Sequence, residues 1–382
     1  MNYFERIHVR GFRRLHDVDL PLKPLNVMIG ANGCGKTSLL DVFSLLSASA
    51  AGDLKGTISE MQGLGANLTV DRAQSMSFDL RMAVPGCNPL VYQLTLAPTG
   101  VAHEIAEEML WQQRDPVPPP FKHIQSIRGD IRYFEVPNGG LVRPTWDHNP
   151  LETSLAQVPK LFREPEEFRK QLASSTHYHV LNVAPRSPVR MPQPLRPAQL
   201  PGADGEDLVS CLFYLREADR DRFEAIEDTL RAGFADFVRL DFPPVAAGTL
   251  AMTWRDRNFT QPLFMHQLSE GTLRFLWLVT LLQSPGLTAV TQIDEPEVSL
   301  HPELLSLLAD LMREASSRTQ LIVATHADRL IRFLQPDEVI ALDLTDDGLA
   351  TATRASEFDL EAWLNEYTLD EVWRMGRIGG RA

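Results

Sequence analysis

Apolar and polar residues alternate along the first part of the chain with the period of β-strands. The alternation runs through residues 3–22 and returns at residues 77–83 and 90–96, which predicts antiparallel strands. Between them, an apolar run over residues 25–29 predicts a buried strand, and apolar residues at helical spacing follow to about residue 50. We therefore expect a strand, a loop and a helix, followed by a β-rich lobe.

The middle of the chain is rich in proline and has weaker periodicity. Strands are expected at residues 103–110 and 131–136, and most of residues 137–205 is expected to be loop. Within that stretch, residues 164–173 favour a helix and residues 178–183 favour a strand. This region is predicted to be an insert.

The last part of the chain returns to regular structure. Helical spacing covers residues 206–234, with a polar break at residues 219–221. Strands and helices then alternate, which predicts a largely parallel sheet. The strands are expected at residues 236–242, 249–254, 287–293, 320–324 and 338–343, and the helices at residues 269–283, 302–315, 327–334, 357–366 and 369–375.

The composition is that of a globular protein with one large domain and an inserted lobe, or with two domains. The chain has 382 residues, of which 44% are hydrophobic and 23% are charged. No apolar run has the length of a membrane span, and the first residues lack a signal-peptide pattern. Three scattered cysteines indicate no disulfide framework. We expect a cytoplasmic protein without a membrane partner.

The net charge of −13 argues against a surface that attracts nucleic acid throughout. Four arginines near the start could still form a local basic face: Arg6, Arg10, Arg13 and Arg14. We favour a solvated strand edge, or contacts to nucleotide phosphates, over DNA binding. Arg13 is accordingly a candidate nucleotide contact.

The loop after residues 25–29 has the spacing G-x-x-x-x-G-K-T of a phosphate-binding P-loop, from Gly30 to Thr37. Glycines let backbone N–H groups curl around phosphates, and the helix start adds a partial positive charge. Lys36 is expected to reach the β- and γ-phosphates and Thr37 to ligate Mg²⁺. A chance glycine-rich turn is disfavoured, because strand and helix are both in place. The candidate nucleotide-binding residues are Asn32, Gly33, Cys34, Gly35, Lys36, Thr37 and Ser38.

A pair of acids, Asp294 and Glu295, closes the strand expected at residues 287–293. In a P-loop protein Asp294 can hold Mg²⁺ through water, and Glu295 can orient or deprotonate the attacking water. Two surface acids in a turn before a proline are the alternative. Thr291 and Gln292 depart from the fully apolar strand that is usual at this place.

Two further short motifs precede and follow these acids. Ser269 and Gly271 stand at the start of an apolar helix, where they either cap it or form a second anion site. His326 comes just after the strand at residues 320–324, where it can sense the γ-phosphate or merely pack. The order of the motifs favours the functional alternative for both.

That order resembles the ABC-type ATPases, and in particular their SMC/RecF-like branch. The matching segments look like stand-alone AAA-family predicted ATPases that are related to OLD-family and other phage-defence proteins. The resemblance covers roughly residues 1–50 and 260–345, and it is carried by Phe12-Arg13-Arg14-Leu15, Ile29 to Thr37, Leu268 to Thr272, Ile293 to Pro296, Leu300-His301-Pro302 and Thr325-His326.

The resemblance implies an α/β fold of the P-loop NTPase class: an ABC-ATPase-like head with a mixed, largely parallel sheet, a β-rich lobe and an inserted helical lid. Residues 1–136 would form the first part of the head, residues 137–260 the insert and lid, and residues 261–382 the second part. Two ATP molecules would lie between two copies of the chain, each held by Lys36 and Thr37 of one copy and by Ser269 and Gly271 of the other.

The function expected is therefore Mg²⁺-dependent ATP hydrolysis by a homodimer, in which Glu295, His326 and Lys36 are catalytic and Thr37 and Asp294 hold the metal. The process it drives is expected to be DNA-related or anti-phage defence. One alternative is a slow, nucleotide-gated module that regulates a separate effector nuclease. Another is a DNA-repair or DNA-binding factor. An ABC transporter subunit fits the N-terminal pattern and the long insert poorly.

Three other features have both a functional and a purely structural interpretation. His177 and His179 alternate along a strand and are candidate metal ligands, but no third ligand has a suitable spacing. Cys34 is either a redox switch or, as we favour, a small tolerated side chain. Three acids near the end resemble a metal-nuclease cluster, yet a nuclease of this kind needs a further domain, so we expect none here: Asp343, Asp346 and Asp347.

Overall fold

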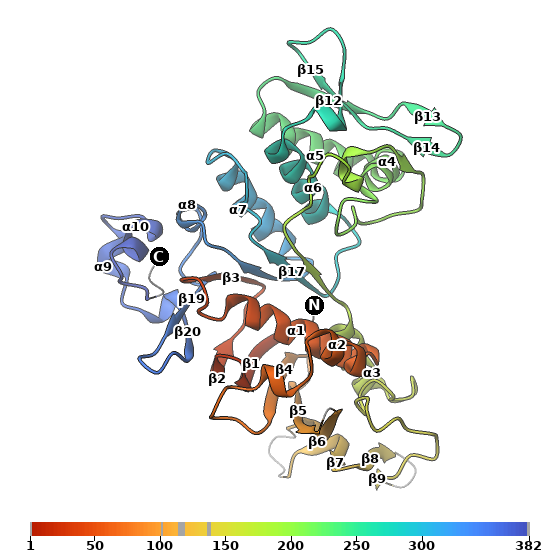
Figure 1. Cartoon of the computed structure of the whole chain (residues 1–382), viewed down its shortest axis with the longest axis vertical. Coiled ribbons are helices and arrows are strands. Elements are labelled where there is room, and N and C mark those ends of the chain that lie inside the picture. Colours follow the sequence, from red (N-terminus) through yellow and green to blue (C-terminus); the bar gives the residue numbers. More distant parts are fainter. Residues whose placement is uncertain (1, 101, 114–118, 136–138, 380–382) are drawn as a thin grey trace. The chain divides into compact units, whose positions relative to one another are not determined.

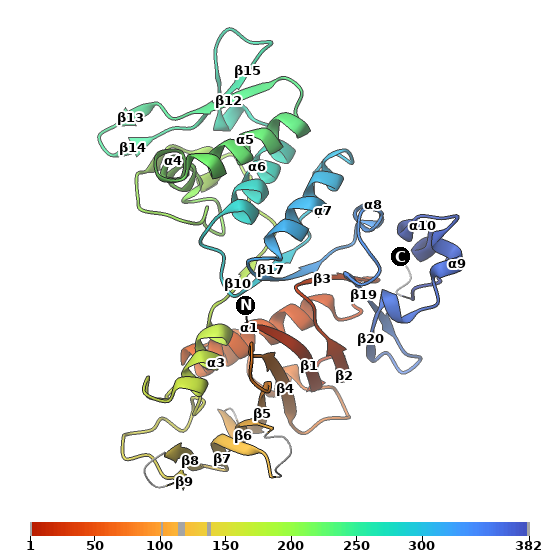
Figure 2. The ribbon, with the colours of Figure 1, turned by 180° about the vertical axis from the view of Figure 1, so that it is seen from behind.

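The structure is a computed structural model that describes residues 2–100, 102–113, 119–135 and 139–379 (Figures 1 and 2). The chain divides into two compact units, of which the first comprises Met1–His177 and Gln335–Ala382 and the second Tyr178–Leu334. Val136, where the first predicted region ends, lies outside the described residues.

The first unit contains an eight-stranded antiparallel sheet with the order β2-β1-β4-β5-β6-β7-β8-β9. Period-two burial, as in Met76–Ala83, confirms the alternation expected for its first strands. The strand Phe121–Ile127 was not predicted, because its inward positions include the polar His123 and Ser126. The strands are β1 (Tyr3–Phe12), β2 (Leu15–Pro21), β4 (Met76–Ala83), β5 (Leu90–Thr99), β6 (Ala102–Gln112), β7 (Phe121–Ile127), β8 (Asp130–Glu135) and β9 (Gly140–Val142).

The strand β3 (Leu25–Ile29) and the helix α1 (Lys36–Ala51) form the predicted strand–loop–helix element of the first unit. All five residues of β3 are buried, and the strand pairs in parallel with β19 (Val339–Leu344). The strand β20 (Ala350–Arg354) then pairs antiparallel with β19. The burial of β3 explains why its run is apolar rather than alternating. The exception is the buried Asn26, whose side-chain amide donates to the Lys23 carbonyl.

Short helices complete the first unit. The helix α3 (Arg163–Ala173) lies beside α1, and its Phe168 packs edge-on against Phe4 of the large sheet, with ring centroids 5.8 Å apart (Figure 1). Because α3 contacts both α1 and the sheet, it belongs to the core of this unit. The other short elements are α2 (Leu54–Glu60), β10 (Ser175–Tyr178), α9 (Glu361–Leu364) and α10 (Leu369–Arg374).

Four helices of the second unit pack in succession: α4 (Leu208–Ala218), α5 (Arg220–Gly233), α6 (Glu270–Gln283) and α7 (Leu304–Ala315) (Figures 1 and 2). The polar break predicted between α4 and α5 is a helix cap, since Asp219 Oδ1 accepts from the Arg222 N–H at 3.3 Å. Two small antiparallel sheets accompany them: β11 (Gln193–Pro194), β14 (Thr249–Leu250) and β13 (Pro244–Ala246), and β12 (Phe237–Asp241), β15 (Thr253–Asp256) and β16 (Leu263–Phe264).

The second unit also contains the parallel pair β17 (Val290–Asp294) and β18 (Gln320–Ala324), followed by the short α8 (Asp328–Ile331). Thr291 and Gln292 are fully buried in β17 despite their polarity. The Thr291 hydroxyl forms a 2.8 Å hydrogen bond with the Thr319 hydroxyl, which satisfies it inside the core.

The strand predicted at residues 178–183 is shifted, since β10 ends at Tyr178. The Val183 carbonyl accepts a 2.7 Å hydrogen bond from Arg190 Nε instead of joining a strand ladder. Within the described part of the chain, no helix combines the length and apolarity needed to cross a bilayer.

Candidate functional site

The P-loop of the first unit closes around the ammonium group of Lys36. Lys36 begins α1 and is buried, and its Nζ donates to the carbonyls of Gly30 at 2.6 Å and Ala31 at 3.0 Å. The loop therefore presents a curled backbone with the cation at its centre, which is the form that suits phosphate oxygens. Of the other candidate residues, Asn32, Gly33 and Thr37 are exposed, Ser38 is half-buried, and Cys34 and Gly35 are buried.

Gly30 has no room for a side chain. Its φ is 146°, and a Cβ built on it would lie 2.3 Å from the Leu342 carbonyl oxygen and 2.8 Å from Cys34 Sγ. The loop thus passes directly against β19, with the Cys34 thiol packed beneath it. This close approach is the structural reason for glycine at the first position of the motif.

Arg13 contacts the P-loop helix rather than open solvent. Its guanidinium forms an ion pair with Asp41 of α1, and Nε donates to Asn67 Oδ1 at 2.9 Å. The residue has a φ of 48°, and the guanidinium lies over the Phe12 ring, 5.0 Å from its centroid. The structure therefore assigns Arg13 a packing partner on α1, and its contact with nucleotide stays a prediction.

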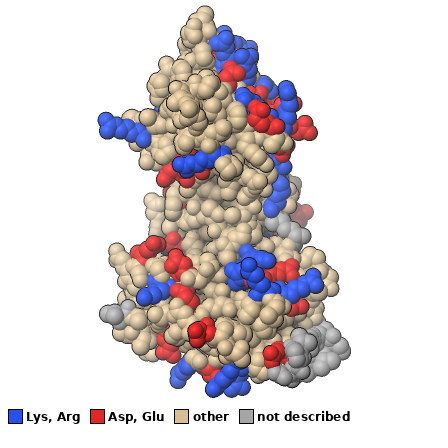
Figure 3. Space-filling model, turned by 90° about the vertical axis from the view of Figure 1, so that its right-hand side faces the viewer, with Lys and Arg blue, Asp and Glu red and all other residues tan. Residues whose placement is uncertain are grey.

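Two of the neighbouring arginines are also paired with acids. Arg6 pairs with Asp19, and Arg10 lies 3.1 Å from Asp79. On the face shown in Figure 3, lysine and arginine side chains are interspersed with aspartate and glutamate. Arg6 and Arg10 thus lie on a strand edge where acids pair with them, whereas Arg14 donates to the Gly348 carbonyl.

In the second unit, Asp294 and Glu295 stand where β17 ends. The Glu295 N–H donates to the Ala324 carbonyl of β18 at 2.8 Å, although Glu295 has left the strand conformation with a φ of 47°. Its carboxylate lies 3.6 Å from His326 Nε2. The parallel pairing of β17 and β18 therefore brings together the predicted base and the predicted switch histidine.

A third side chain, Glu297, organises the same end of the sheet. Its Oε1 accepts a 3.1 Å hydrogen bond from the His326 backbone N–H. Burial raises the pKa of Glu297, the Glu295 charge acts in the same direction, and hydrogen bonds from Thr325 and His326 oppose both. Sequence reasoning gave Glu297 no role; its place two residues after Glu295 was the only available signal.

Ser269 is the N-cap of α6. Its Oγ accepts from the Thr272 N–H at 3.1 Å, so the serine caps the helix as well as standing at its positive end. A Cβ on Gly271 would lie 2.5 Å from the Ser299 carbonyl oxygen. The helix start therefore packs directly against the loop that follows Glu295.

Arg274 joins these two segments. Its Nη1 donates to Ser299 Oγ, its Nε donates to the Leu181 carbonyl at 3.3 Å, and its guanidinium lies 3.7 Å from Glu270. Ser299 has a φ of 63°. Sequence reasoning missed Arg274, because a single arginine inside an apolar helix belongs to no recognisable motif.

Residues 25–332 match the family described as "AAA domain, putative AbiEii toxin, Type IV TA system". The chain belongs to this family. Over 42 residues, this AAA-family ATPase domain is 48% identical to the OLD nuclease of Thermus scotoductus. That match spans 11% of the chain and only 8% of the nuclease.

Solved structures with a similar fold are heads of SMC proteins. The SMC head bound to the C-winged helix domain of ScpA superposes with a TM-score of 0.55 and 16% identity, covering 92% of this chain and 97% of that one. The SMC head with an extended coiled coil, bound to the C-terminal domain of ScpA from Pyrococcus furiosus, superposes with a TM-score of 0.53 and 13% identity. This match covers 98% of each chain. The AAA-family chain thus has an SMC head-like P-loop ATPase fold, as the sequence resemblance predicted.

Proposed function

We propose that this AAA-family protein binds ATP with Mg²⁺ and hydrolyses it to ADP and phosphate. The observation that carries the proposal is the contact between Glu295 Oε1 and His326 Nε2, 3.6 Å apart at the ends of two buried parallel strands. A half-exposed carboxylate held beside an imidazole can orient and deprotonate a water, and the imidazole can respond to the charge of a γ-phosphate. Family membership supports NTPase activity in general.

The roles of the remaining residues follow from their chemistry. Lys36 and the backbone of residues 32–38 bind the phosphates, with Arg13 as a further nucleotide contact. Mg²⁺, held by the Thr37 hydroxyl and Asp294, would neutralise phosphate charge. The curled P-loop around Lys36 Nζ fits a phosphate group, and the half-exposed carboxylate ending β17 fits a hard cation.

We further propose that the active form is a homodimer closed by two ATP molecules. Ser269 is exposed at the N-terminus of α6, where the partial positive charge of the helix end favours an anion from outside the unit. Gly271 packs that end against Ser299, so a phosphate bound by a second copy would be sensed beside Glu295. Solved SMC heads of similar fold lend support at the level of fold alone.

The process driven by ATP is proposed to be DNA-related or anti-phage defence, with a separate effector nuclease or DNA as the partner. The short match to an OLD nuclease supports this class. A slow, nucleotide-gated regulator would show a steady-state turnover below about one per minute, well under ordinary enzyme rates. A DNA-binding factor would show salt-dependent duplex binding that ATP strengthens.

The test compares Glu295→Gln with wild type in an ATPase assay and in light scattering. We expect hydrolysis to fall at least about a hundredfold and ATP to accumulate a dimer, since the variant binds ATP without activating water. Glu303→Gln is the matched control, because Glu303 is 89% exposed in the same unit, and it should behave as wild type. If wild type hydrolyses ATP normally while ATP enriches no dimer of Glu295→Gln, the two-copy mechanism is wrong.

A further inference from the structure

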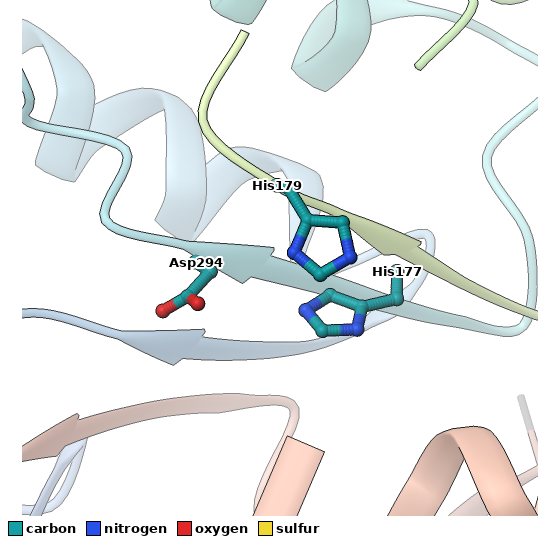
Figure 4. A group of neighbouring side chains, drawn as sticks. All are labelled: His177, His179 and Asp294. Carbon is teal, nitrogen blue, oxygen red and sulfur yellow. The ribbon is translucent and has the colours of Figure 1, made fainter. Parts of the chain in front are cut away.

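The two histidines that alternate near the end of the insert are not assigned a metal. His177 belongs to the first compact unit and His179 to the second. Figure 4 shows the carboxylate of Asp294 turned away from the imidazole ring of His179. Asp294 is moreover the residue proposed to hold Mg²⁺ at the nucleotide site. We therefore assign no metal to these histidines.

We propose that a cavity in the first unit binds an uncharged heteroaromatic ligand that carries hydroxyl groups, such as a nucleoside. The cavity has a volume of about 770 Å³, which lies in the range of small-molecule sites. It is lined mainly by β7, β8, the loop that follows β9 and the start of α3, and α3 contacts β7 (Figures 1 and 2). None of the described residues that line it belongs to the P-loop, so it would be a second, separate site.

Aromatic rings form much of the cavity wall. Phe121 of β7 and Phe134 of β8 pack edge-on with ring centroids 4.3 Å apart. Trp146 and Phe162, which precede α3, have ring centroids 6.4 Å apart. The buried Tyr133 packs against Trp146, with 5.1 Å between their ring centroids. Because neighbouring rings hold one another in place, the wall offers preformed surfaces on which a planar heteroaromatic ring can stack.

One polar atom of the wall needs an acceptor. The Nε1–H of Trp146 is buried, and no residue that the structure describes accepts a hydrogen bond from it. Buried donors in proteins are normally paired, so this indole indicates an acceptor that comes from outside the chain. A ring nitrogen or carbonyl oxygen of a nucleobase is such an acceptor, whereas an ammonium ion has none to offer.

The charges at the cavity disfavour an ionic ligand of either sign. Glu135 and Glu164 contribute two carboxylates and Arg163 one guanidinium, and the whole chain has a net charge of −13, which disfavours a polyphosphate. Arg163 and the positive end of α3, which no described side chain caps, in turn disfavour a cation. An uncharged ligand fits both conditions, and the hydroxyl groups of a sugar can donate to carboxylates.

The test is isothermal titration calorimetry of the full-length protein with adenosine, guanosine, cytidine and uridine in the absence of ATP. Nucleosides lack the phosphates that the P-loop is proposed to hold, so their binding reports on the cavity and not on the ATP site. We expect at least one of them to bind, one molecule per chain, with a Kd of about 100 µM or lower. If no nucleoside binds saturably, the proposal is wrong, whatever the ATPase activity.

Two variants connect binding to the cavity. Trp146→Phe keeps an aromatic ring but removes the N–H, and it should weaken binding about three- to tenfold. Phe134→Leu removes an aromatic face and should weaken binding at least about fivefold. Trp363→Phe is the matched control, because Trp363 is a half-buried tryptophan of the same unit outside the cavity, and it should bind as wild type does. Thermal melting checks folding, and wild-type affinity in either folded cavity variant overturns the proposal.

Two ionic probes test the argument from charge in a Lys36→Ala background, which weakens phosphate binding at the P-loop. The monophosphate of the best-bound nucleoside and tetramethylammonium should each bind at least about threefold more weakly than that nucleoside. Tighter binding of either ion that Phe134→Leu removes would identify an anion site or a cation cage and overturn the assignment to an uncharged ligand.

Discussion

The backbone N–H of His326 donates to Oε1 of Glu297 at 3.1 Å, and this hydrogen bond links the second residue after β18 to the loop after β17. Glu297 is two residues from Glu295, whose carboxylate lies 3.6 Å from the imidazole of the same histidine. Two glutamates thus hold one histidine by its backbone and its side chain. Glu297 is therefore a positioning residue for the proposed base and switch.

Replacing Glu297 tests this role. Glu297→Ala should lower kcat for ATP hydrolysis about 10- to 100-fold with little change in ATP affinity, because displacing catalytic groups by about 1 Å costs on that order. Steady-state kinetics and nucleotide titration separate the two effects. Glu314→Ala, which removes an exposed carboxylate from α7, is the control and should leave both kcat and ATP affinity unchanged. An unchanged kcat in folded Glu297→Ala would contradict the positioning role.

The contact between Gly271 and Ser299 gives a second prediction. In Gly271→Ala, the new Cβ would lie 2.5 Å from the Ser299 carbonyl oxygen, so the start of α6 or the adjoining loop must shift. We expect ATP-dependent dimerisation to be lost while ATP still binds to the P-loop. Light scattering and equilibrium nucleotide binding measure the two properties.

The control for Gly271→Ala is Gly65→Ala, where a Cβ meets nothing within 4 Å. That variant should dimerise as wild type does. Normal ATP-dependent dimerisation of Gly271→Ala would show that the α6 terminus does not contribute to the interface.

Gly30 gives a third prediction, on nucleotide binding. Gly30→Ala forces a side chain into a φ of 146° and against the Leu342 carbonyl, so the P-loop must move away from β19. We expect ATP affinity to fall at least about tenfold, corresponding to roughly 1.4 kcal/mol. Nucleotide titration should place this variant near Lys36→Ala, and a wild-type affinity would argue against the loop as the phosphate site.

The fourth prediction concerns the buried carboxylate of Glu108 in β6. It accepts hydrogen bonds from the Tyr92 hydroxyl at 3.0 Å and from the backbone N–H groups of Ser154 at 2.6 Å and Leu155 at 2.8 Å. Glu108→Ala should lower the free energy of unfolding by about 3 kcal/mol, because three buried donors lose their acceptor. Chemical denaturation measures this, and half-buried Glu107 provides the control variant Glu107→Ala.

The pH dependence of Glu108 has a definite sign. Burial raises its pKa in the folded protein above the ordinary value of 4.5. The folded state therefore holds the Glu108 proton more tightly than the unfolded state does, so protonation of Glu108 stabilises the fold. This stabilisation is lost as pH rises through the folded pKa. Denaturation midpoints from pH 4 to 8 should decline less in Glu108→Gln than in wild type. A parallel decline in both would assign the effect to another group.

Some elements were predictable because their determinants are local. The P-loop, its strand and its helix follow from one apolar run and one glycine pattern, and the alternating strands around them follow from period-two burial. The strand β7 was not predicted, because the polar residues His123 and Ser126 occupy inward positions and interrupt the alternating pattern. The strand expected at residues 178–183 ends at Tyr178, and the Val183 carbonyl accepts a hydrogen bond from the Arg190 side chain.

The sequence by itself determined the fold class and the strand, glycine-rich loop and helix that begin at Leu25, since periodicity and turn chemistry act over a few neighbouring residues. Only the tertiary structure decided which side chains meet across long separations. It joined Glu297 to His326 and Arg274 to Ser299. Such pairings depend on strand register and helix packing between distant segments, and no local pattern encodes them.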